Sequence, residues 1–357
     1  QHLSLFADAP AAMRCLALFA SGVAAGLPPH LQTVSDLNEN NQDQLIQEIL
    51  ASPLTKLAPT IGAPDRVTTT SLPTVVAHGM GDSCFNGGMK SITKGVANAT
   101  TQYATCIPTG DNWLSDTING FLLNMDKSVD VFAKKIQADP KLKGGFNAVG
   151  FSQGNSLIRG YIQKYNDPPV NAFLSVHGTV MGVAAFPSCF EQEKPLGLIC
   201  KGLAEVLGDL AYNPLSQGVL FQADYYRDPA LAQSKGYLRW SQLAAWNNEN
   251  PATANATQKD NFAKTKRFAM VKALKDSMVY PNEAEWWGQM EDGAYGKALE
   301  MKDTRWYKED LFGLKTADEA GKIQFETTPG DHLQFTDKEL YGWVAKYFQD
   351  GEASVVV

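Results

Sequence analysis

One short motif constrains this chain more than any other feature of its sequence. Gly150-Phe151-Ser152-Gln153-Gly154 has the form G-x-S-x-G and lies between an apolar segment at residues 146–149 and a helical pattern at 153–165. In a nucleophile elbow, a serine sits on a sharp turn from strand to helix, and small residues two positions away on either side prevent clashes. The bare pattern also fits an ordinary glycine turn, but its position between strand and helix favours the elbow. Ser152 is therefore the candidate nucleophile.

Strand-like and helix-like segments alternate on both sides of this motif, which is typical of a parallel sheet with helices on its faces. We expect strands at residues 73–77, 103–107, 146–149, 172–176, 267–272 and 322–326, and helices at 89–99, 114–138, 153–165 and 337–348. The alternation lapses between about residues 180 and 266, which we interpret as an insertion. The sequence thus predicts an α/β-hydrolase fold, with a mostly parallel central sheet and a lid-like insertion after the sixth strand of that fold.

A serine hydroxyl is a poor nucleophile unless a base removes its proton, so a histidine is required, and an acid should orient it. Among the five histidines, His332 follows the last expected strand, where an α/β-hydrolase places its base. Asp276 directly follows the apolar run at 267–274 and is the candidate acid. The other aspartates weighed for this role, which close no clear strand or lie too close to the histidine, are Asp303, Asp310, Asp318 and Asp331.

Negative charge on the substrate oxygen needs preorganised donors, which this fold usually supplies as two backbone N–H groups. The N–H of Gln153 follows the nucleophile, and that of Met80 lies in the glycine-rich turn after the first expected strand. We expect these two groups to form the oxyanion hole. His78, in the same turn, is interpreted as structural rather than catalytic.

The N-terminal region resembles a secretory leader. Met13-Arg14 is followed by an apolar run and the small residues Val23-Ala24-Ala25, a pattern typical of a signal peptide that is cleaved before Gly26. We therefore divide the chain into an upstream extension and signal peptide at 1–25, a loosely ordered leader at 26–70 and a hydrolase domain at 71–357. Two sequons, at Asn98 and Asn255, would be usable for glycosylation in the secretory pathway.

The cysteines agree with an oxidising compartment. Removal of Cys15 with the signal peptide leaves four, which allow three pairings. Sequence proximity favours Cys189 with Cys200 and, by elimination, Cys84 with Cys106. No CxxC pair or suitably spaced histidine accompanies them, so disulfides are favoured over a zinc site, and we expect no metal.

Charge and hydropathy exclude several other classes of protein. The net charge is −7 and the isoelectric point about 5.3, without a long basic run, so the chain has no evident attraction for nucleic acid. No segment approaches the roughly 18 consecutive apolar residues of a membrane span. We expect a mature chain without a transmembrane segment.

The motifs together resemble those of the lysosomal palmitoyl-protein thioesterases, in particular the type 1 enzyme, from about residue 73 to the end. The segments that carry this resemblance are His78-Gly79-Met80-Gly81-Asp82-Ser83-Cys84, Asp139-Pro140-Lys141-Leu142, Gly150-Phe151-Ser152-Gln153-Gly154, Gln222-Ala223-Asp224-Tyr225-Tyr226, residues 271–277 and Gly330-Asp331-His332-Leu333-Gln334. The resemblance implies Ser152 as nucleophile, Asp276 as acid, His332 as base and Met80 with Gln153 as oxyanion donors. It also implies S-palmitoylated proteins as substrates, no cofactor, and a lysosomal location, with export as the alternative.

Two departures from the family pattern accompany the resemblance. Phe85 stands where the family has a second cysteine after Cys84, and a Gly-Gly-Gln-His stretch of the family reads His177-Gly178-Thr179-Val180 here. The second difference is expected to affect the pocket entrance or the substrate preference. A lipase or general carboxylesterase would share the same triad, and a binding module could retain the fold without catalysis, so both remain alternatives to the thioesterase.

Overall fold

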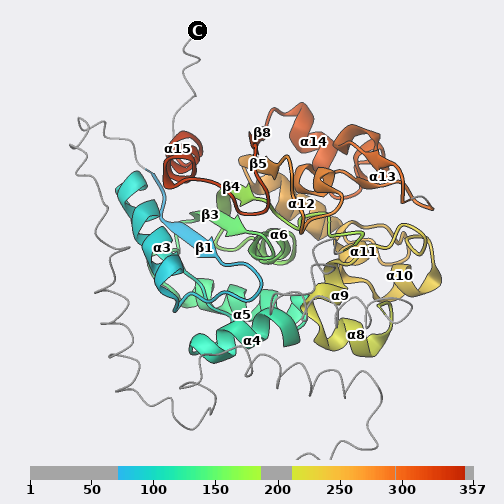
Figure 1. The fold of residues 1–357 in the computed structure, drawn as a ribbon, viewed down its shortest axis with the longest axis horizontal. Coiled ribbons are helices and arrows are strands. Elements are labelled where there is room, and N and C mark those ends of the chain that lie inside the picture. The colour runs from blue at the N-terminus through green and yellow to red at the C-terminus, as the bar shows by residue number, and fades with distance from the viewer. Residues whose placement is uncertain (1–70, 186–210, 294, 350–357) are drawn as a thin grey trace, which may run out of the picture. The chain divides into compact units, whose positions relative to one another are not determined.

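Six parallel strands form the central sheet of the computed structural model, which describes residues 71–185, 211–293 and 295–349 (Figure 1). The strands are β1 (Thr74–Ala77), β2 (Ala104–Cys106), β3 (Phe146–Phe151), β4 (Val170–Val176), β5 (Arg267–Ala273) and β8 (Ile323–Thr328). Their order in the sheet is β2-β1-β3-β4-β5-β8, and every neighbouring pair is parallel. The expected parallel sheet is confirmed. The expected signal peptide, the leader and the Cys189–Cys200 pair lie outside the described residues.

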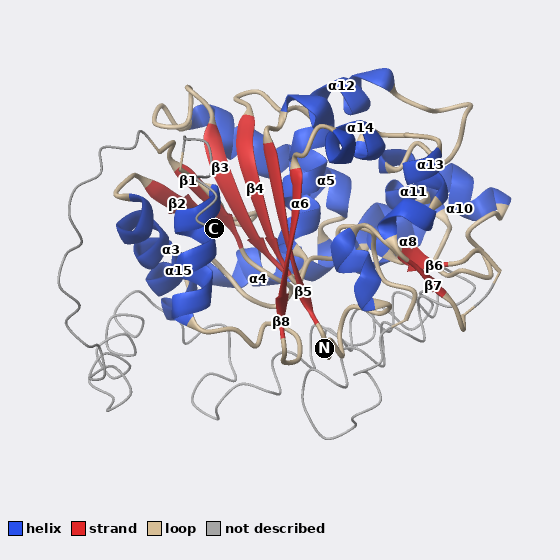
Figure 2. Cartoon of the chain, turned by 90° about the horizontal axis from the view of Figure 1, so that it is seen from above, coloured by secondary structure: helices blue, strands red, loops and turns tan. Residues whose placement is uncertain are grey.

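Helices cover both faces of this sheet (Figure 2). On one face, α3 (Gly87–Thr100) and α15 (Asp337–Tyr347) share an apolar core with the strands, in which Val96, Leu340 and Val344 are fully buried. The opposite face is covered by α5 (Met125–Ala138), α6 (Gly154–Lys164) and α12 (Ala256–Lys264). Parallel sheets are stable when both faces are covered in this way, because their strands are apolar on both sides.

The helix expected over 114–138 is wrong as a single element, because the structure contains two helices, α4 (Trp113–Leu122) and α5, with a break at Leu123 and Asn124. The Asn124 side chain accepts a hydrogen bond from the Lys127 N–H at 3.0 Å, and an N-terminal cap of this kind begins a new helix. Both helices are apolar on one side, so the periodicity alone did not mark the break.

Short helices occupy the described part of the segment between β4 and β5, where the sequence indicates an insertion. They are α8 (Pro214–Val219), α9 (Phe221–Tyr225), α10 (Lys235–Trp240), α11 (Gln242–Trp246) and α12. This segment follows β4, the fourth strand of the described sheet. The described helices are all too short or too polar to cross a bilayer.

Further elements between β5 and β8 had no clear signal in the sequence. They are the 3₁₀ turns η6 (Asn282–Trp286) and η7 (Met301–Asp303), the hairpin of β6 (Gln289–Met290) and β7 (Ala298–Leu299), and the helices α13 (Arg305–Lys308) and α14 (Leu314–Glu319). Each of these is at most six residues long, too short to show a period.

The parallel arrangement brings the carboxyl ends of the strands to the same edge of the sheet. The loops after β1, β3, β4, β5 and β8 begin at this edge, which is where open α/β sheets bind their ligands. All three residues of the expected triad belong to these loops.

Candidate active site

Ser152 lies on a strained turn between β3 and α6. Its φ is 52°, in the left-handed region that a non-glycine residue rarely adopts. A Cβ at Gly150 would lie 2.4 Å from Asn155 Oδ1, and a Cβ at Gly154 would lie 2.4 Å from the carbonyl oxygen of Ala77. Both glycines are therefore required by close packing, which is the physical basis of the G-x-S-x-G pattern at this turn.

His332 connects the other two members of the expected triad. Its Nε2 lies 2.9 Å from Ser152 Oγ, and its Nδ1 lies 2.6 Å from Asp276 Oδ2. The Asp276 side chain is completely buried, whereas 11% of the His332 side chain is exposed. The structure thus brings together a hydroxyl, an imidazole and a carboxylate from the loops after β3, β8 and β5, in the arrangement that activates a serine.

The surroundings of Asp276 favour its ionised form. Burial by itself would raise the pKa of this carboxyl, but the hydrogen bond and charge of His332, together with two backbone donors, outweigh burial and lower it. The backbone donors are the N–H groups of Met278 and Val279, at 2.7 and 2.6 Å from Oδ1. Asp276 is therefore suited to orient His332 and to stabilise its protonated form.

The alternative aspartates have other partners. Asp331 accepts hydrogen bonds from the backbone of His332 and from Ser277, so it joins two of the three loops that carry the triad, those after β5 and β8. Asp310 pairs with Lys259, Asp318 with Lys302, and Asp303 lies 3.9 Å from Lys308. Among the described aspartates, only Asp276 is hydrogen-bonded to the His332 ring.

His177 is a residue near the triad whose contribution the sequence did not predict. It follows β4 and is completely buried. Its Nδ1 accepts the backbone N–H of Leu333 at 2.8 Å, and its Nε2 lies 2.9 Å from Thr328 Oγ1. Burial, reinforced by repulsion from His332, lowers the pKa of His177 to about 4. A neutral His177 thus holds the backbone of Leu333 beside the candidate base. In the sequence, the one signal for this residue was that the stretch beginning at His177 departs from the family pattern.

The loop after β1 lies against the nucleophile. A Cβ at Gly79 would come 3.2 Å from the Cβ of Ser152, a tighter contact than is usual, so glycine favours the close approach of the Met80 segment. The structure places Met80 and Gln153, whose N–H groups are the expected oxyanion donors, in the two segments that flank Ser152. Within the described residues, neither N–H has a hydrogen-bond acceptor. The assignment of these two N–H groups as oxyanion donors stays a prediction.

The Gln153 side chain is held by hydrogen bonds from the insertion. Its Oε1 accepts hydrogen bonds from Gln222 Nε2 at 2.8 Å and from the Tyr225 hydroxyl at 3.2 Å, while its Nε2 donates to the Gly120 carbonyl. Gln222 and Tyr225 belong to α9. The segment between β4 and β5 therefore contacts the residue that follows the nucleophile, which the sequence could not specify.

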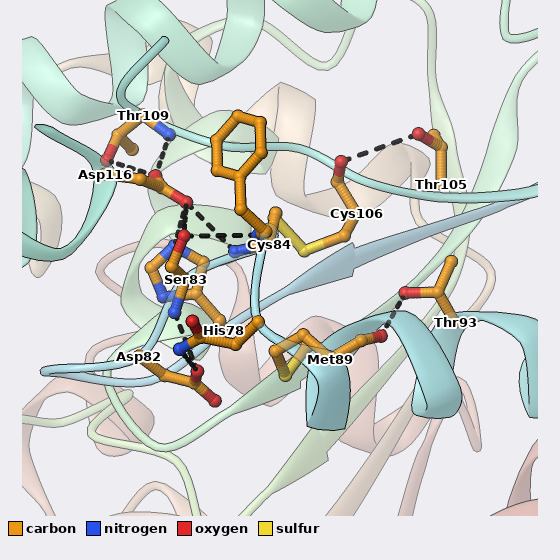
Figure 3. The surroundings of a disulfide bond; sticks show 12 residues. His78, Asp82, Ser83, Cys84, Met89, Thr93, Thr105, Cys106, Thr109 and Asp116 are labelled. Carbon is orange, nitrogen blue, oxygen red and sulfur yellow. Dashed lines mark hydrogen bonds and ion pairs between the residues drawn. A yellow bond between two sulfur atoms is a disulfide. The ribbon is translucent and has the colours of Figure 1, made fainter. Parts of the chain in front are cut away.

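A buried ion pair of His78 with Asp116 supports the loop after β1 (Figure 3). His78 Nε2 lies 3.2 Å from Asp116 Oδ2, and Nδ1 lies 2.9 Å from the Gly79 carbonyl oxygen. Asp116 also accepts hydrogen bonds from the backbone of Cys84 and Thr109. Burial alone would lower the pKa of His78, but its contacts with Asp116 outweigh burial and raise it. This agrees with the interpretation of His78 as structural.

The raised pKa of His78 gives its contribution to stability a defined pH dependence. A protonated His78 stabilises the fold fully below the unfolded pKa of about 6.5, and that contribution is lost as the pH rises through the folded pKa. We expect His78→Gln to lower the free energy of unfolding by about 3 kcal/mol at pH 5.5 and by less at pH 8.5. Urea denaturation at the two pH values measures this, and equal losses would contradict a charged His78.

A disulfide joins Cys84 to Cys106, at the carboxyl end of β2, with a sequence separation of 22 (Figure 3). We expect non-reducing peptide mapping to recover Cys84 joined to Cys106 and Cys189 joined to Cys200. Loss of the first bridge should reduce the free energy of unfolding by about 3 kcal/mol, because the closed loop restricts the unfolded chain. Free thiols at all four positions would contradict both pairings.

The sequon residues Asn98 and Asn255 are exposed.

Two groups of described side chains lie close enough together to hold a metal ion. In the first, made by His78, Cys84 and Asp116, the cysteine sulfur is already in the disulfide and offers no thiolate. In the second, made by His177, Asp276 and His332, the donor atoms already form the hydrogen bonds described above. A metal would have to break these contacts before it could bind.

Comparison with known proteins agrees with the family expected from the motifs. A model of the family described as palmitoyl protein thioesterase matches residues 73–332. Palmitoyl-protein thioesterase 1 of Caenorhabditis elegans is 36% identical over 289 residues, which cover 79% of this chain and 94% of that protein. Palmitoyl-protein thioesterase 3 of Dictyostelium discoideum is 32% identical over 224 residues, covering 63% of this chain and 73% of that protein.

Among solved structures, the RedJ thioesterase from the prodiginine biosynthetic pathway in Streptomyces coelicolor aligns with a TM-score of 0.41 and 12% identity, over 82% of this chain and 99% of that one. The family model covers well over half of this chain, and the nematode relative is matched along nearly its whole length. The chain belongs to the palmitoyl protein thioesterase family.

Proposed function

We propose that this protein hydrolyses long-chain fatty acyl thioesters, in particular palmitoyl groups on protein cysteines, through a serine acyl-enzyme. One observation carries the proposal: His332 contacts Ser152 Oγ at 2.9 Å and Asp276 Oδ2 at 2.6 Å, as a charge-stabilised base requires. Membership of the family and the names of the relatives support a thioester as the substrate class.

The first half of the reaction acylates Ser152. As Oγ attacks the thioester carbonyl carbon, Nε2 of His332 takes the hydroxyl proton, and Asp276 stabilises the imidazolium that forms. The negative carbonyl oxygen is bound by the backbone N–H groups of Met80 and Gln153. Collapse of this intermediate breaks the carbon–sulfur bond, and the sulfur leaves as the cysteine thiol after it receives the proton from His332.

The second half releases the fatty acid by the same route. A water molecule gives its proton to Nε2 of His332 and attacks the acyl carbon, and the same two N–H groups bind the oxyanion. Collapse then breaks the ester bond and returns the proton to Ser152 Oγ. The triad and backbone donors are sufficient for both steps, so the proposed mechanism uses no cofactor.

The cellular location and partners follow from the same proposal. The disulfide of the described residues and the exposed sequons support a secretory route, and relatives named lysosomal thioesterase are known from Xenopus laevis and Rattus norvegicus. We infer that the protein acts in the lysosome, on S-palmitoylated proteins or peptides that reach it there. Export remains the alternative location.

Two measurements test the function against its alternatives. A fluorophosphonate probe should label Ser152 covalently, and failure to label the folded protein would favour a non-catalytic binding module. Hydrolysis of palmitoyl thioesters should then be compared with hydrolysis of triglycerides and simple carboxyl esters. Faster turnover of the oxygen esters would assign the protein to the lipases or carboxylesterases.

A further inference from the structure

A second buried carboxyl group lies beside the acid of the triad. Glu285 belongs to the 3₁₀ turn η6, which packs against the end of β5, and none of its surface is exposed. Its Oε2 accepts the Ala273 N–H at 3.0 Å. Its Oε1 is buried and, within the described residues, has no conventional donor. The Asp276 side chain is a hydrogen-bond partner of this carboxyl.

The charges and donors around the two carboxyls determine which of them is ionised. Asp276 has three hydrogen-bond donors and a lowered pKa, so it is the member of the pair that stays ionised. Burial, followed by the charge of Asp276, raises the pKa of Glu285 well above its usual value. The charge of Lys272, whose Nζ lies 4.2 Å from the centroid of the Trp286 ring, lowers the pKa of Glu285 and only partly offsets these effects. Two adjacent buried carboxyls therefore retain one proton.

We propose that Glu285 is a positioning residue that carries this proton on Oε1 and donates it to the Asp276 carboxylate, adding a fourth member to the chain of Ser152, His332 and Asp276. The inference rests on the proposed function, because it assigns Glu285 a role in orienting the acid of that triad. The donated hydrogen bond fixes the Asp276 carboxylate in the plane that His332 requires. The backbone N–H of Ala273 fixes Glu285 in turn.

The chain offers matched variants to test this role. In Glu285→Gln, the side-chain amide can still donate to Asp276 and accept from Ala273 without a titratable proton. Glu285→Leu is similar in size but has no donor. Glu283→Gln makes the same substitution in the same turn at a partly exposed position and serves as the control.

The proton on Glu285 is detected through the pH dependence of the free energy of unfolding. In the folded protein Glu285 binds a proton that the unfolded chain loses above a pKa of about 4.3, so folding of the wild type weakens with rising pH up to the folded pKa. We consider the ratio of the folding equilibrium constant of Glu285→Gln to that of the wild type at each pH. Because only the wild type loses the proton on unfolding, this ratio should increase by up to about tenfold per pH unit between pH 5 and 7. Glu283→Gln should show no such trend. A ratio for Glu285→Gln that is independent of pH would overturn the proposal.

The positioning role is measured by the rate at which a fluorophosphonate labels Ser152. We expect Glu285→Gln to label within about threefold of wild type, and Glu285→Leu at least about tenfold more slowly, the loss expected for a hydrogen bond to a charged group. Equal rates in both variants would overturn the positioning role. If the wild type itself is not labelled, the proposed function fails instead, while the stability measurement still reports the proton on Glu285.

Discussion

Replacing Ser152 by alanine should reduce thioester hydrolysis by about 10⁴-fold or more while leaving the fold intact. The members of a triad act as a unit, so that removal of the nucleophile leaves only the contribution of substrate binding and the oxyanion donors. Alanine fills nearly the same volume and removes only the hydroxyl that contacts His332. Steady-state kinetics with a palmitoyl thioester measures the loss, and chemical denaturation measures the fold.

Ser156→Ala provides the matched control for this prediction. Ser156 is a buried serine on α6, one turn beyond the elbow, and its hydroxyl contacts Thr179 rather than His332. Its replacement should cost about 1 kcal/mol of stability and leave turnover nearly unchanged. Near-normal activity in folded Ser152→Ala would reject Ser152 as the nucleophile. A large loss in Ser156→Ala would mean that the elbow is sensitive to any nearby change.

The order of the motifs predicted how the triad would assemble, because a parallel sheet brings the carboxyl ends of its strands to one edge. Ser152, Asp276 and His332 each follow a strand, and their loops meet although up to 180 residues separate them in sequence. This convergence needs only the strand pattern and the chain order. It does not depend on the details of the loops.

The supporting residues could not be predicted in the same way. The pairs of Asp116 with His78 and of Glu285 with Asp276 join segments with no common motif, and a single sequence carries no signal for such contacts. Glu283 and Glu285 look equivalent in the sequence, yet only Glu285 is fully buried. Burial depends on how the turn packs against β5, which is a tertiary property.

The break between α4 and α5 shows a similar limit at the level of secondary structure. Asn124 is a good N-cap, but asparagine also occurs within helices at modest cost, so its identity alone does not define a boundary. In the structure the Asp224 side chain accepts the Met125 N–H at 2.6 Å, so the start of α5 is also fixed by a residue from the insertion. The long-range contact and the local cap together divide the helix although the apolar pattern continues.

The insertion between β4 and β5 bears on which acyl chains the protein accepts. Its helix α9 contacts the side chain of Gln153, the residue that follows the nucleophile in sequence. Within α9 and its cap, Leu220 and Phe221 are buried and serve the core. From the sequence, some of the apolar side chains of the insertion are expected to line an acyl groove, and the candidates are Phe186, Leu196, Leu198, Ile199, Leu203, Val206, Leu207, Leu210, Val219, Leu220 and Phe221. Those at 186–210 lie outside the described residues. The acyl groove is therefore a prediction, and its consequence can be measured directly.

We expect kcat/KM for a palmitoyl thioester to exceed that for an acetyl thioester by more than a hundredfold. Each methylene buried in an apolar groove contributes about 0.8 kcal/mol, and a hundredfold preference corresponds to about 2.7 kcal/mol, so about four buried methylenes already account for it. A palmitoyl chain has several times that number, which means that the preference should grow with length until the groove is filled.

The measurement uses thioesters from two to eighteen carbons, each kept below the concentration at which it forms micelles. Hydroxide-catalysed hydrolysis of the same series serves as the control, because it reports the intrinsic reactivity of each thioester without an apolar groove. A rise in kcat/KM with chain length that is absent from the control assigns the preference to buried methylenes. A flat profile, or a maximum at short chains, would reject the groove and favour a general esterase, because the triad would then act on any acyl group that reaches Ser152.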